Sequence, residues 1–180
     1  MSLIEIEKKI KFKNFVDLSK EEALQVLEYR NLPEVRKNML TQEIIREDDH
    51  LTFIQYLKSE KTKLYYGVEY DGEIIGAVYL TEINAKDKIA SWGIYIGKHK
   101  FVGIGAVVAY AFVEFVFNDL MFECMQSEVF HYNKSAIQLN KTFGFVTTNK
   151  NDDLVFMSLD KLTWSTQYKI KILKLIKRLG

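Results

Sequence analysis

The sequence predicts a mixed α/β domain in which helices cover a central, mostly antiparallel sheet. Three observations indicate this fold class: a β-hairpin signal over residues 64–81, a strand that runs into a glycine-opened helix over 89–118, and a second strand–helix–strand unit over 122–159. A run of strands followed by alternating strands and helices is typical of such domains. No repeat, low-complexity segment or Pro/Gly-rich linker divides the chain, so residues 1–180 are expected to form one domain.

The first third of the chain predicts one strand and three helical segments. Ser19 and Glu22 form a capping box, S-x-x-E, which is a signature of a helix start. Pro33 ends this helix, because proline disfavours a helical conformation in the residue before it. The expected elements are a strand over 10–18 and helices over 19–29, 34–39 and 49–58.

From Leu64 onward the hydrophobic pattern changes to the period of strands. Asp71-Gly72 lies between two apolar segments and favours the tight turn whose twist matches paired strands. Residues 64–70 and 73–81 are therefore expected to form a hairpin. The remaining expected elements are strands over 89–96, 122–130 and 154–159 and helices over 103–118 and 133–142.

Composition excludes several classes of function. The 25 Lys and Arg residues balance 24 Asp and Glu residues, which is not the basic excess of a nucleic-acid-binding protein. One cysteine, Cys124, excludes an internal disulfide framework, and the three histidines lack the spacing of metal ligands. No signal-peptide pattern and no run of about 20 apolar residues is present, so a cytoplasmic protein without a metal is expected.

A basic, glycine-containing turn joins the strand over 89–96 to the next helix. Gly103 and Gly105 would let a ligand approach the backbone, and free N–H groups at a helix N-terminus favour a phosphate. Lys98 and Lys100 add positive charge. The turn predicts a pyrophosphate site, and tight strand-to-helix packing is the competing explanation of the two glycines.

Two segments resemble cofactor motifs of the GCN5-related N-acetyltransferase superfamily. Lys100-x-x-Gly103-x-Gly105 is similar to its R/Q-x-x-G-x-G/A pyrophosphate loop. Residues 128–145 are similar to its V-x-x-x-N-x-x-A-I-x-x-Y-x-x-x-G-F segment, with Asn133, Ala136, Ile137, Gly144 and Phe145 in place. The two motifs together are more specific than either alone. The resemblance spans about residues 10–160 and implies an N-acetyltransferase that uses acetyl-coenzyme A.

The resemblance also implies an architecture and a path for the cofactor. The neighbouring parallel strands over 89–96 and 122–130 are expected to splay apart in a sheet with helices on both faces. The pantetheine arm would then pair with the backbone groups that the splay leaves free, and N–H groups near Ile94 would face the thioester carbonyl. The implied cofactor-binding residues are Ile94, Tyr95, Ile96, Lys100, Phe101, Val102, Gly103, Ile104, Gly105, Ala106, Asn133 and Ala136.

The implied chemistry needs a base for the amine proton and a donor for the departing thiolate. Glu128 is the favoured base, with His131 as the rival and a plain solvated glutamate as the competing interpretation. Asn140 stands where the superfamily has a tyrosine that protonates the thiolate, and an amide donates a hydrogen bond but not a proton. Hydrogen bonding by Asn140 or a proton from Tyr95 or Tyr132 would have to serve. Otherwise the chain is a non-catalytic sensor that binds acetyl-coenzyme A.

Residues 28–54 resemble the acceptor segment of bacterial nucleotide-sugar N-acetyltransferases, which act on a UDP-linked 4-amino-4,6-dideoxy sugar in pseudaminic acid synthesis. The R-N-x-P-x-x-x-x-x-M pattern and His50-Leu51-x-Phe53-Ile54 carry this likeness. An arginine suits a diphosphate through paired hydrogen bonds. The expected acceptor-binding residues are Arg30, Asn31, Met39, His50, Phe53, Thr81 and Trp92. Internal ion pairs or core packing are the competing roles, and ribosomal-protein N-terminal and polyamine acetyltransferases remain alternatives.

Residues 162–179 are predicted to form a basic amphipathic helix. Ile172, Leu173, Ile176 and Leu179 share one face, and the lysines lie largely opposite. Such a helix can lie weakly on an anionic membrane surface, or it can pack on its own domain or on the partner in a homodimer. Packing is the favoured interpretation.

Overall fold

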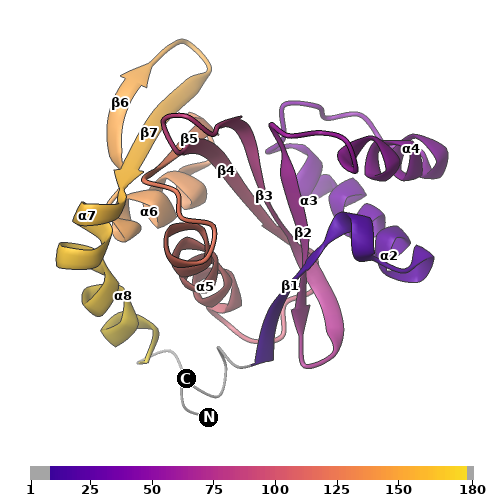
Figure 1. Cartoon of the computed structure of the whole chain (residues 1–180), viewed down its shortest axis with the longest axis horizontal. Helices are drawn as coiled ribbons and strands as arrows, with labels where there is room; N and C mark the ends of the chain where they lie inside the picture. The colour runs from indigo at the N-terminus through magenta and orange to yellow at the C-terminus, as the bar shows by residue number, and fades with distance from the viewer. Residues whose placement is uncertain (1–8, 178–180) are drawn as a thin grey trace.

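The computed structural model describes residues 9–177, which contain a seven-stranded sheet with helices on both faces (Figure 1). The strand order is β1-β2-β3-β4-β5-β7-β6, and every neighbouring pair is antiparallel except β4 and β5. The mixed α/β fold class predicted from the sequence is therefore confirmed. The strands are β1 (Ile10–Asn14), β2 (Leu64–Tyr70), β3 (Glu73–Asn84), β4 (Ile89–Ile96), β5 (Cys124–Phe130), β6 (Val146–Lys150) and β7 (Leu154–Asp160).

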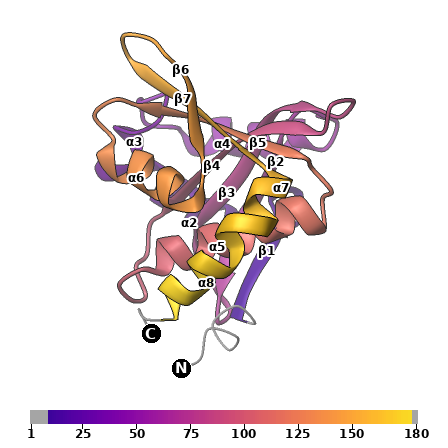
Figure 2. The ribbon, with the colours of Figure 1, turned by 90° about the vertical axis from the view of Figure 1, so that its left-hand side faces the viewer.

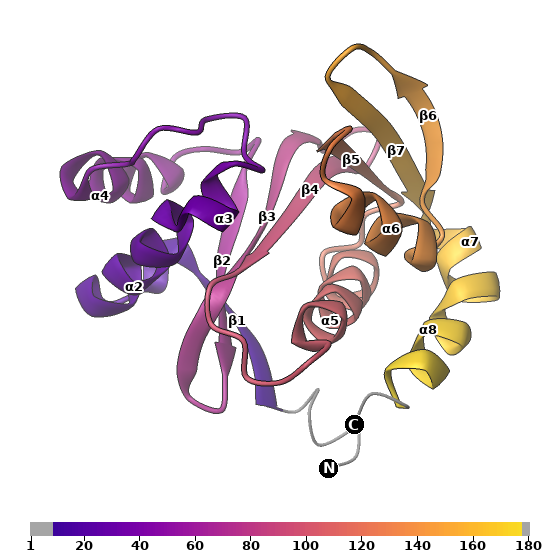
Figure 3. The same cartoon turned by 180° about the vertical axis from the view of Figure 1, so that it is seen from behind.

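The helices divide between the two faces of the sheet, as Figures 1 and 3 show. One face carries α2 (Lys20–Asn31), α3 (Pro33–Arg36) and α4 (Glu47–Leu57). The other carries α5 (Ile104–Asn118), α6 (Lys134–Phe143), α7 (Lys161–Thr163), the π-helix η2 (Trp164–Tyr168) and α8 (Lys169–Ile176). A larger apolar core lies between the sheet and α5, and a smaller one lies beneath α2 and α4. Burial of these two faces holds the layers together.

Local side-chain contacts set several helix ends. The predicted capping box is present: the Ser19 Oγ accepts from the Glu22 N–H at 3.2 Å, and the Glu22 carboxylate accepts from the Ser19 N–H at 2.7 Å. The predicted strand over 10–18 stops at Asn14, because the Asn14 side chain accepts from the Val16 N–H at 3.2 Å. That bond starts a short 3₁₀ helix, η1 (Phe15–Asp17), in place of the expected strand end.

The splay between β4 and β5 is present. The two strands pair only from Ile89–Cys124 to Ser91–Gln126, and beyond these positions no pairing between them exists in the described residues. Trp92 and Ser127 are the first residues after the last pair. Both strands continue, β4 bonded to β3 and β5 bonded to β7. The edges that face the opening therefore carry backbone N–H and C=O groups available to a ligand.

The C-terminal helical region packs on its own chain. The Trp164 Nε1 donates to the Glu114 carboxylate at 2.6 Å, and Trp164, Ile172 and Ile176 are almost fully buried (Figure 2 shows α7 and α8 beside α5). The predicted helix over 162–179 is divided by η2, and its last two residues lie outside the described part of the chain. Ile172 and Ile176, two residues of the predicted apolar face, therefore pack on the chain's own domain, and contact with a membrane surface stays a prediction. Within residues 9–177, no helix combines the length and apolar character of a membrane span.

Candidate functional site

A cavity of about 130 Å³ lies over the part of the sheet where β4 and β5 diverge. It brings together four of the residues predicted from the sequence, Met39, Thr81, Trp92 and Glu128. The remaining lining residues are Asn38, Leu40, Tyr79, Glu82, Ser91, Phe130 and Leu154. Apolar walls with a few convergent polar groups are typical of a small-molecule site.

Glu128, on β5, shares this cavity with a second carboxylate, Glu82 on β3. The Glu82 carboxylate accepts a hydrogen bond from the Ser91 Oγ at 2.9 Å. Burial and then the negative charge of Glu82 raise the pKa of Glu128 above its ordinary value. A raised pKa makes a carboxylate a stronger proton acceptor, which suits the base predicted here.

Aromatic rings form the wall beside Met39. The Tyr79 hydroxyl lies 3.7 Å from the Met39 sulfur, and the Tyr79 ring stacks on Tyr65 with ring centroids 5.1 Å apart. Gly93 makes this possible, because a Cβ at that position would lie 2.2 Å from the Tyr79 ring. Phe53 packs behind Tyr65, with ring centroids 5.1 Å apart, and does not line the cavity; its role in acceptor binding stays a prediction.

Trp92, on β4, borders the cavity, while its ring packs in the larger core on the α5 side of the sheet. Its ring stacks on Phe145, with centroids 5.8 Å apart, and its exposed fraction is only 6%. Among the described residues the buried indole N–H has no hydrogen-bond partner. An unpaired buried donor is costly, and such groups are often satisfied by water or ligand.

Three predicted acceptor residues make contacts within the α2–α4 region. The Asn31 side chain donates to the Ile45 carbonyl at 2.8 Å and accepts from the Ile45 N–H at 2.9 Å. His50 is buried, with its Nε2 3.0 Å from the Ala23 carbonyl, and burial lowers the pKa of His50. Neither residue lines the cavity, and their role in acceptor binding stays a prediction. The Arg30 Nη2 donates to the Thr41 carbonyl at 2.7 Å, and its buried Nη1 has no partner among residues 9–177.

Neither tyrosine proposed as a thiolate donor lines the cavity. Tyr95 is buried in the smaller core, and burial raises the pKa of its hydroxyl far above the ordinary value, which opposes proton donation. Tyr132 stacks on Phe130 and donates to the Lys37 carbonyl at 2.5 Å. The rival base His131 contacts the Asn151 carbonyl through its Nε2 at 2.7 Å.

Asn140 lies in the interior between α6 and the sheet, with an exposed fraction of 3%. Its Nδ2 donates to the Ser127 Oγ at 2.9 Å and also lies 3.8 Å from the Met157 sulfur. Ser127 is the first β5 residue beyond the last β4–β5 pair. The Asn140 amide therefore orients a hydroxyl at the point where the splay opens.

The predicted pyrophosphate loop has a conformation that fits a phosphate. Gly103 caps α5 with φ at 92°, in the left-handed region that favours glycine. A Cβ at Gly105 would meet nothing nearer than the Ile96 Cγ1 at 4.0 Å, so the packing of the protein does not require glycine there. The open backbone at Gly105 and the helix N-terminus together fit an anionic ligand.

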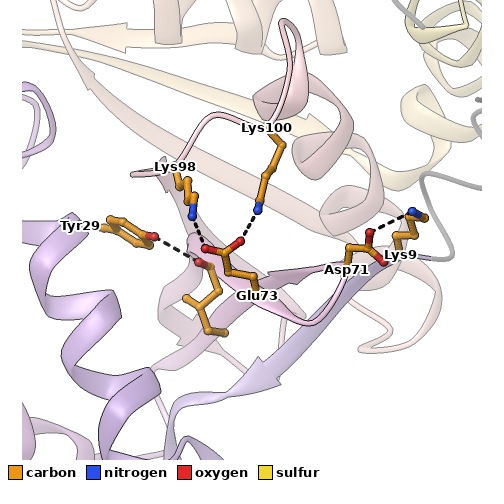
Figure 4. Close-up of polar contacts among 7 residues, drawn as sticks. Lys9, Tyr29, Asp71, Glu73, Lys98 and Lys100 are labelled. Carbon is orange, nitrogen blue, oxygen red and sulfur yellow. Dashed lines mark hydrogen bonds and ion pairs between the residues drawn. The ribbon is translucent and has the colours of Figure 1, made fainter.

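The basic side chains of this loop have an internal partner. Figure 4 shows Lys98 and Lys100 converging on the Glu73 carboxylate at the start of β3. Lys100 and then Lys98 lower the pKa of Glu73. Val102, another predicted residue of the loop, is highly exposed, and Phe101 packs on Tyr70 at 5.9 Å. Among the described contacts, Lys100 therefore balances a carboxylate of its own chain.

The other predicted cofactor residues fall into two groups. Asn133 caps α6: its Oδ1 accepts from the Ala136 N–H at 3.2 Å, so these predicted contact groups bond to each other. The Ala106 N–H likewise donates to the Gly103 carbonyl at 2.9 Å. Ile94 and Ile96, on β4, are partly buried against the larger core, with Ile104 beneath them in α5. Their backbone borders the splay, as predicted.

Comparison with known proteins identifies the family to which this chain is similar. The family model for the acetyltransferase (GNAT) domain matches residues 16–158. Two proteins named acetyltransferase PseH from Campylobacter jejuni are 28% and 29% identical over 150 residues, 83% of this chain and 93% of each relative.

Solved structures agree on the fold. Campylobacter jejuni N-acetyltransferase PseH in complex with acetyl coenzyme A has a TM-score of 0.69 at 24% identity, covering 84% of this chain and 99% of that one. Spermidine N-acetyltransferase from Vibrio cholerae in complex with CoA and spermine has a TM-score of 0.77 at 16% identity, covering 88% and 99%. The chain belongs to the GNAT acetyltransferase family and is an acetyl-coenzyme A-dependent N-acetyltransferase.

Proposed function

We propose that the chain transfers an acetyl group to the amine of a nucleotide-linked amino sugar, of the UDP-4-amino-4,6-dideoxyhexose type. The cavity that places Met39 and Trp92 beside Glu128 carries this proposal. Its apolar walls suit the methyl group of a deoxy sugar, and its carboxylate suits the reacting amine. The volume of about 130 Å³ has room for the reacting end of an acceptor, so the nucleotide would lie outside it. Similarity to the PseH acetyltransferases supports a nucleotide-sugar acceptor.

Acetyl-coenzyme A supplies the thioester that the amine attacks, and this chain offers three groups to hold it. The open backbone at Gly103 and Gly105 would take the pyrophosphate. Lys100 would exchange its bond with Glu73 for one to a phosphate. The free strand edges of the splay would bind the pantetheine arm, as an added strand binds a sheet edge.

Two side chains would move protons at this site. Glu128, whose pKa is raised, takes up the proton that the amine must lose. Ser127 accepts a hydrogen bond from Asn140, which leaves its own hydroxyl proton free to donate toward the leaving sulfur. We infer that Ser127 and Asn140 together replace the superfamily tyrosine that protonates the thiolate, by donating a hydrogen bond to the leaving sulfur. Tyr95 is less suited, because burial raises the pKa of its hydroxyl, and Tyr132 is less suited, because its hydroxyl already donates to the Lys37 carbonyl.

The experiment compares purified protein and acetyl-coenzyme A with a panel of UDP- and dTDP-linked amino sugars, spermidine and N-terminal peptides. Acetylated product is followed by mass spectrometry, and we expect turnover confined to a 4-amino sugar nucleotide. Turnover with spermidine or peptide alone would refute the sugar assignment and leave the family assignment intact. The homodimer and the cytoplasmic location remain predictions.

A further inference from the structure

Glu82 lies in the acceptor cavity because β3 departs from regular strand geometry. Side chains alternate between faces along a strand, and Tyr79 and Thr81 both line the cavity. Glu82, the next residue, would by alternation point to the opposite face. Its φ is 51°, in the left-handed region that non-glycine residues rarely adopt, and the β3–β4 register shifts between Thr81 and Asn84. Bulges of this kind redirect side chains and are common beside active sites.

The redirected carboxylate is fixed in place by a neighbouring strand. The Ser91 Oγ, on β4, donates to the Glu82 carboxylate at 2.9 Å. Ser91 itself is buried and also lines the cavity. This hydrogen bond fixes the orientation of the Glu82 carboxylate in the cavity.

Glu128 shares the cavity with the Glu82 carboxylate and has few other ionisable neighbours there. Tyr79 and Glu82, both from β3, are the titratable residues beside it in the cavity among the described residues. The lining residues from β4, β7 and the segment after α3 are neutral there. On the opposite side Glu128 borders a second cavity, whose other lining residues are neutral: Gln126, Ser127, Thr148, Asn149, Phe156 and Met157.

We propose that Glu82 is a second acceptor-binding carboxylate beside the proton acceptor Glu128: the two carboxylates bind the acceptor amine in its cationic form, and Glu82 strengthens Glu128 as the base. The inference rests on the proposed acceptor cavity. The placement of both carboxylates in that one cavity, with Glu82 redirected into it by the bulge and held there by Ser91, carries the inference.

The proton balance of this step is simple. The ammonium N–H bond breaks, its proton passes to Glu128, and the electron pair stays on nitrogen. That pair forms the new N–C bond while the C–S bond breaks with its electrons on sulfur. Of the two protons that leave the nitrogen, one is released to solvent through Glu128 and the other neutralises the thiolate. Glu82 gains and loses no proton in this sequence, because it acts through its charge.

The test measures Glu128 directly in the free protein, without an acceptor. Carboxyl ¹³C NMR of glutamate-labelled protein follows the titration, with the Glu128 signal assigned from its absence in Glu128→Gln. Because Glu82 raises the pKa of Glu128, we expect Glu82→Gln to move the Glu128 midpoint to lower pH. Glu82→Asp keeps the charge and is expected to stay nearer to wild type. Glu123→Gln, at an exposed glutamate that lines neither cavity, is the matched control and should leave the midpoint unchanged.

Steady-state kinetics with the acceptor found in the panel complete the test. Glu82→Gln should move the acidic limb of kcat/KM to lower pH and raise the acceptor KM by about two- to fivefold, as for a partly exposed ion pair. A Glu128 midpoint and a pH profile that both overlay wild type in folded Glu82→Gln would overturn the inference while leaving the acceptor assignment intact. Failure of every amino sugar would refute that assignment, and the NMR result would still decide the role of Glu82.

Discussion

Gly105→Ala should make the protein more stable and its cofactor binding weaker. The added Cβ would meet only the Ile96 Cγ1 at 4.0 Å, and Gly105 is not among the glycines with positive φ. Replacing a helical glycine by alanine stabilises a helix by about 0.5–1 kcal/mol. For a protein of about 150–250 residues this raises Tm by roughly 1–4 °C. The same methyl group would occupy the open space that we assign to the pyrophosphate, so the Kd for acetyl-coenzyme A should rise at least about tenfold.

Gly105→Ala is expected to raise stability and to weaken cofactor binding, so general damage to the fold cannot explain the loss of affinity. Thermal unfolding by circular dichroism gives Tm, and calorimetric titration with acetyl-coenzyme A gives Kd. Gly103→Ala provides the contrast: its φ of 92° costs an alanine about 1–2 kcal/mol, so both stability and affinity should fall. A Gly105→Ala protein that is more stable and binds with unchanged affinity would show that the ligand does not approach this backbone.

Three further outcomes follow from single contacts. Asn31→Ala removes both hydrogen bonds to Ile45 and should lower the free energy of unfolding, measured in urea, by about 1–3 kcal/mol. The affinity for acetyl-coenzyme A should not change. A changed KM for the acceptor in a variant of wild-type stability would instead indicate that Asn31 contacts the sugar. Ser127→Ala should lower kcat by about 10²-fold with little change in the Kd for acetyl-coenzyme A, and Asn140→Ala should also lower kcat. A wild-type kcat in both variants would show that Ser127 and Asn140 have no role in catalysis. Burial lowers the pKa of His50, so its contribution to stability is complete above the ordinary value of 6.5 and is lost as pH falls below it. His50→Gln should therefore show a smaller fall in Tm between about pH 7 and 5, and an equal fall would contradict this.

Local patterns predicted most of the fold, and the errors have local causes. Alternation, capping and glycine signals placed β2, β4 and α5 within a residue or so of their ends. Strand β6 was missed, because all its residues are exposed and leave no alternating apolar pattern to detect. It forms by pairing with β7 at the sheet edge, a contact that the segment Val146–Lys150 does not encode alone.

The candidate site was less predictable, since it depends on contacts between distant residues. The motif positions near Gly103 and Glu128 could be found because their spacing is diagnostic. Asn31 and His50 match the same resemblance, yet their polar atoms bond to backbone carbonyls far along the chain, at Ile45 and Ala23. Glu82 gave no signal at all, because its place in the cavity follows from a bulge and not from a pattern.

The bond between Glu73 and the two lysines of the cofactor loop has a consequence for selectivity among anions. In the free protein the loop already has an internal counterion, so a phosphate must displace a carboxylate and not merely fill an empty basic patch. Exposed ion pairs are weak, so a ligand that makes several contacts to the loop replaces them more readily than a lone inorganic phosphate, which makes few. We therefore expect Glu73 to compete with small anions for the two lysines and to favour a large cofactor that makes several contacts.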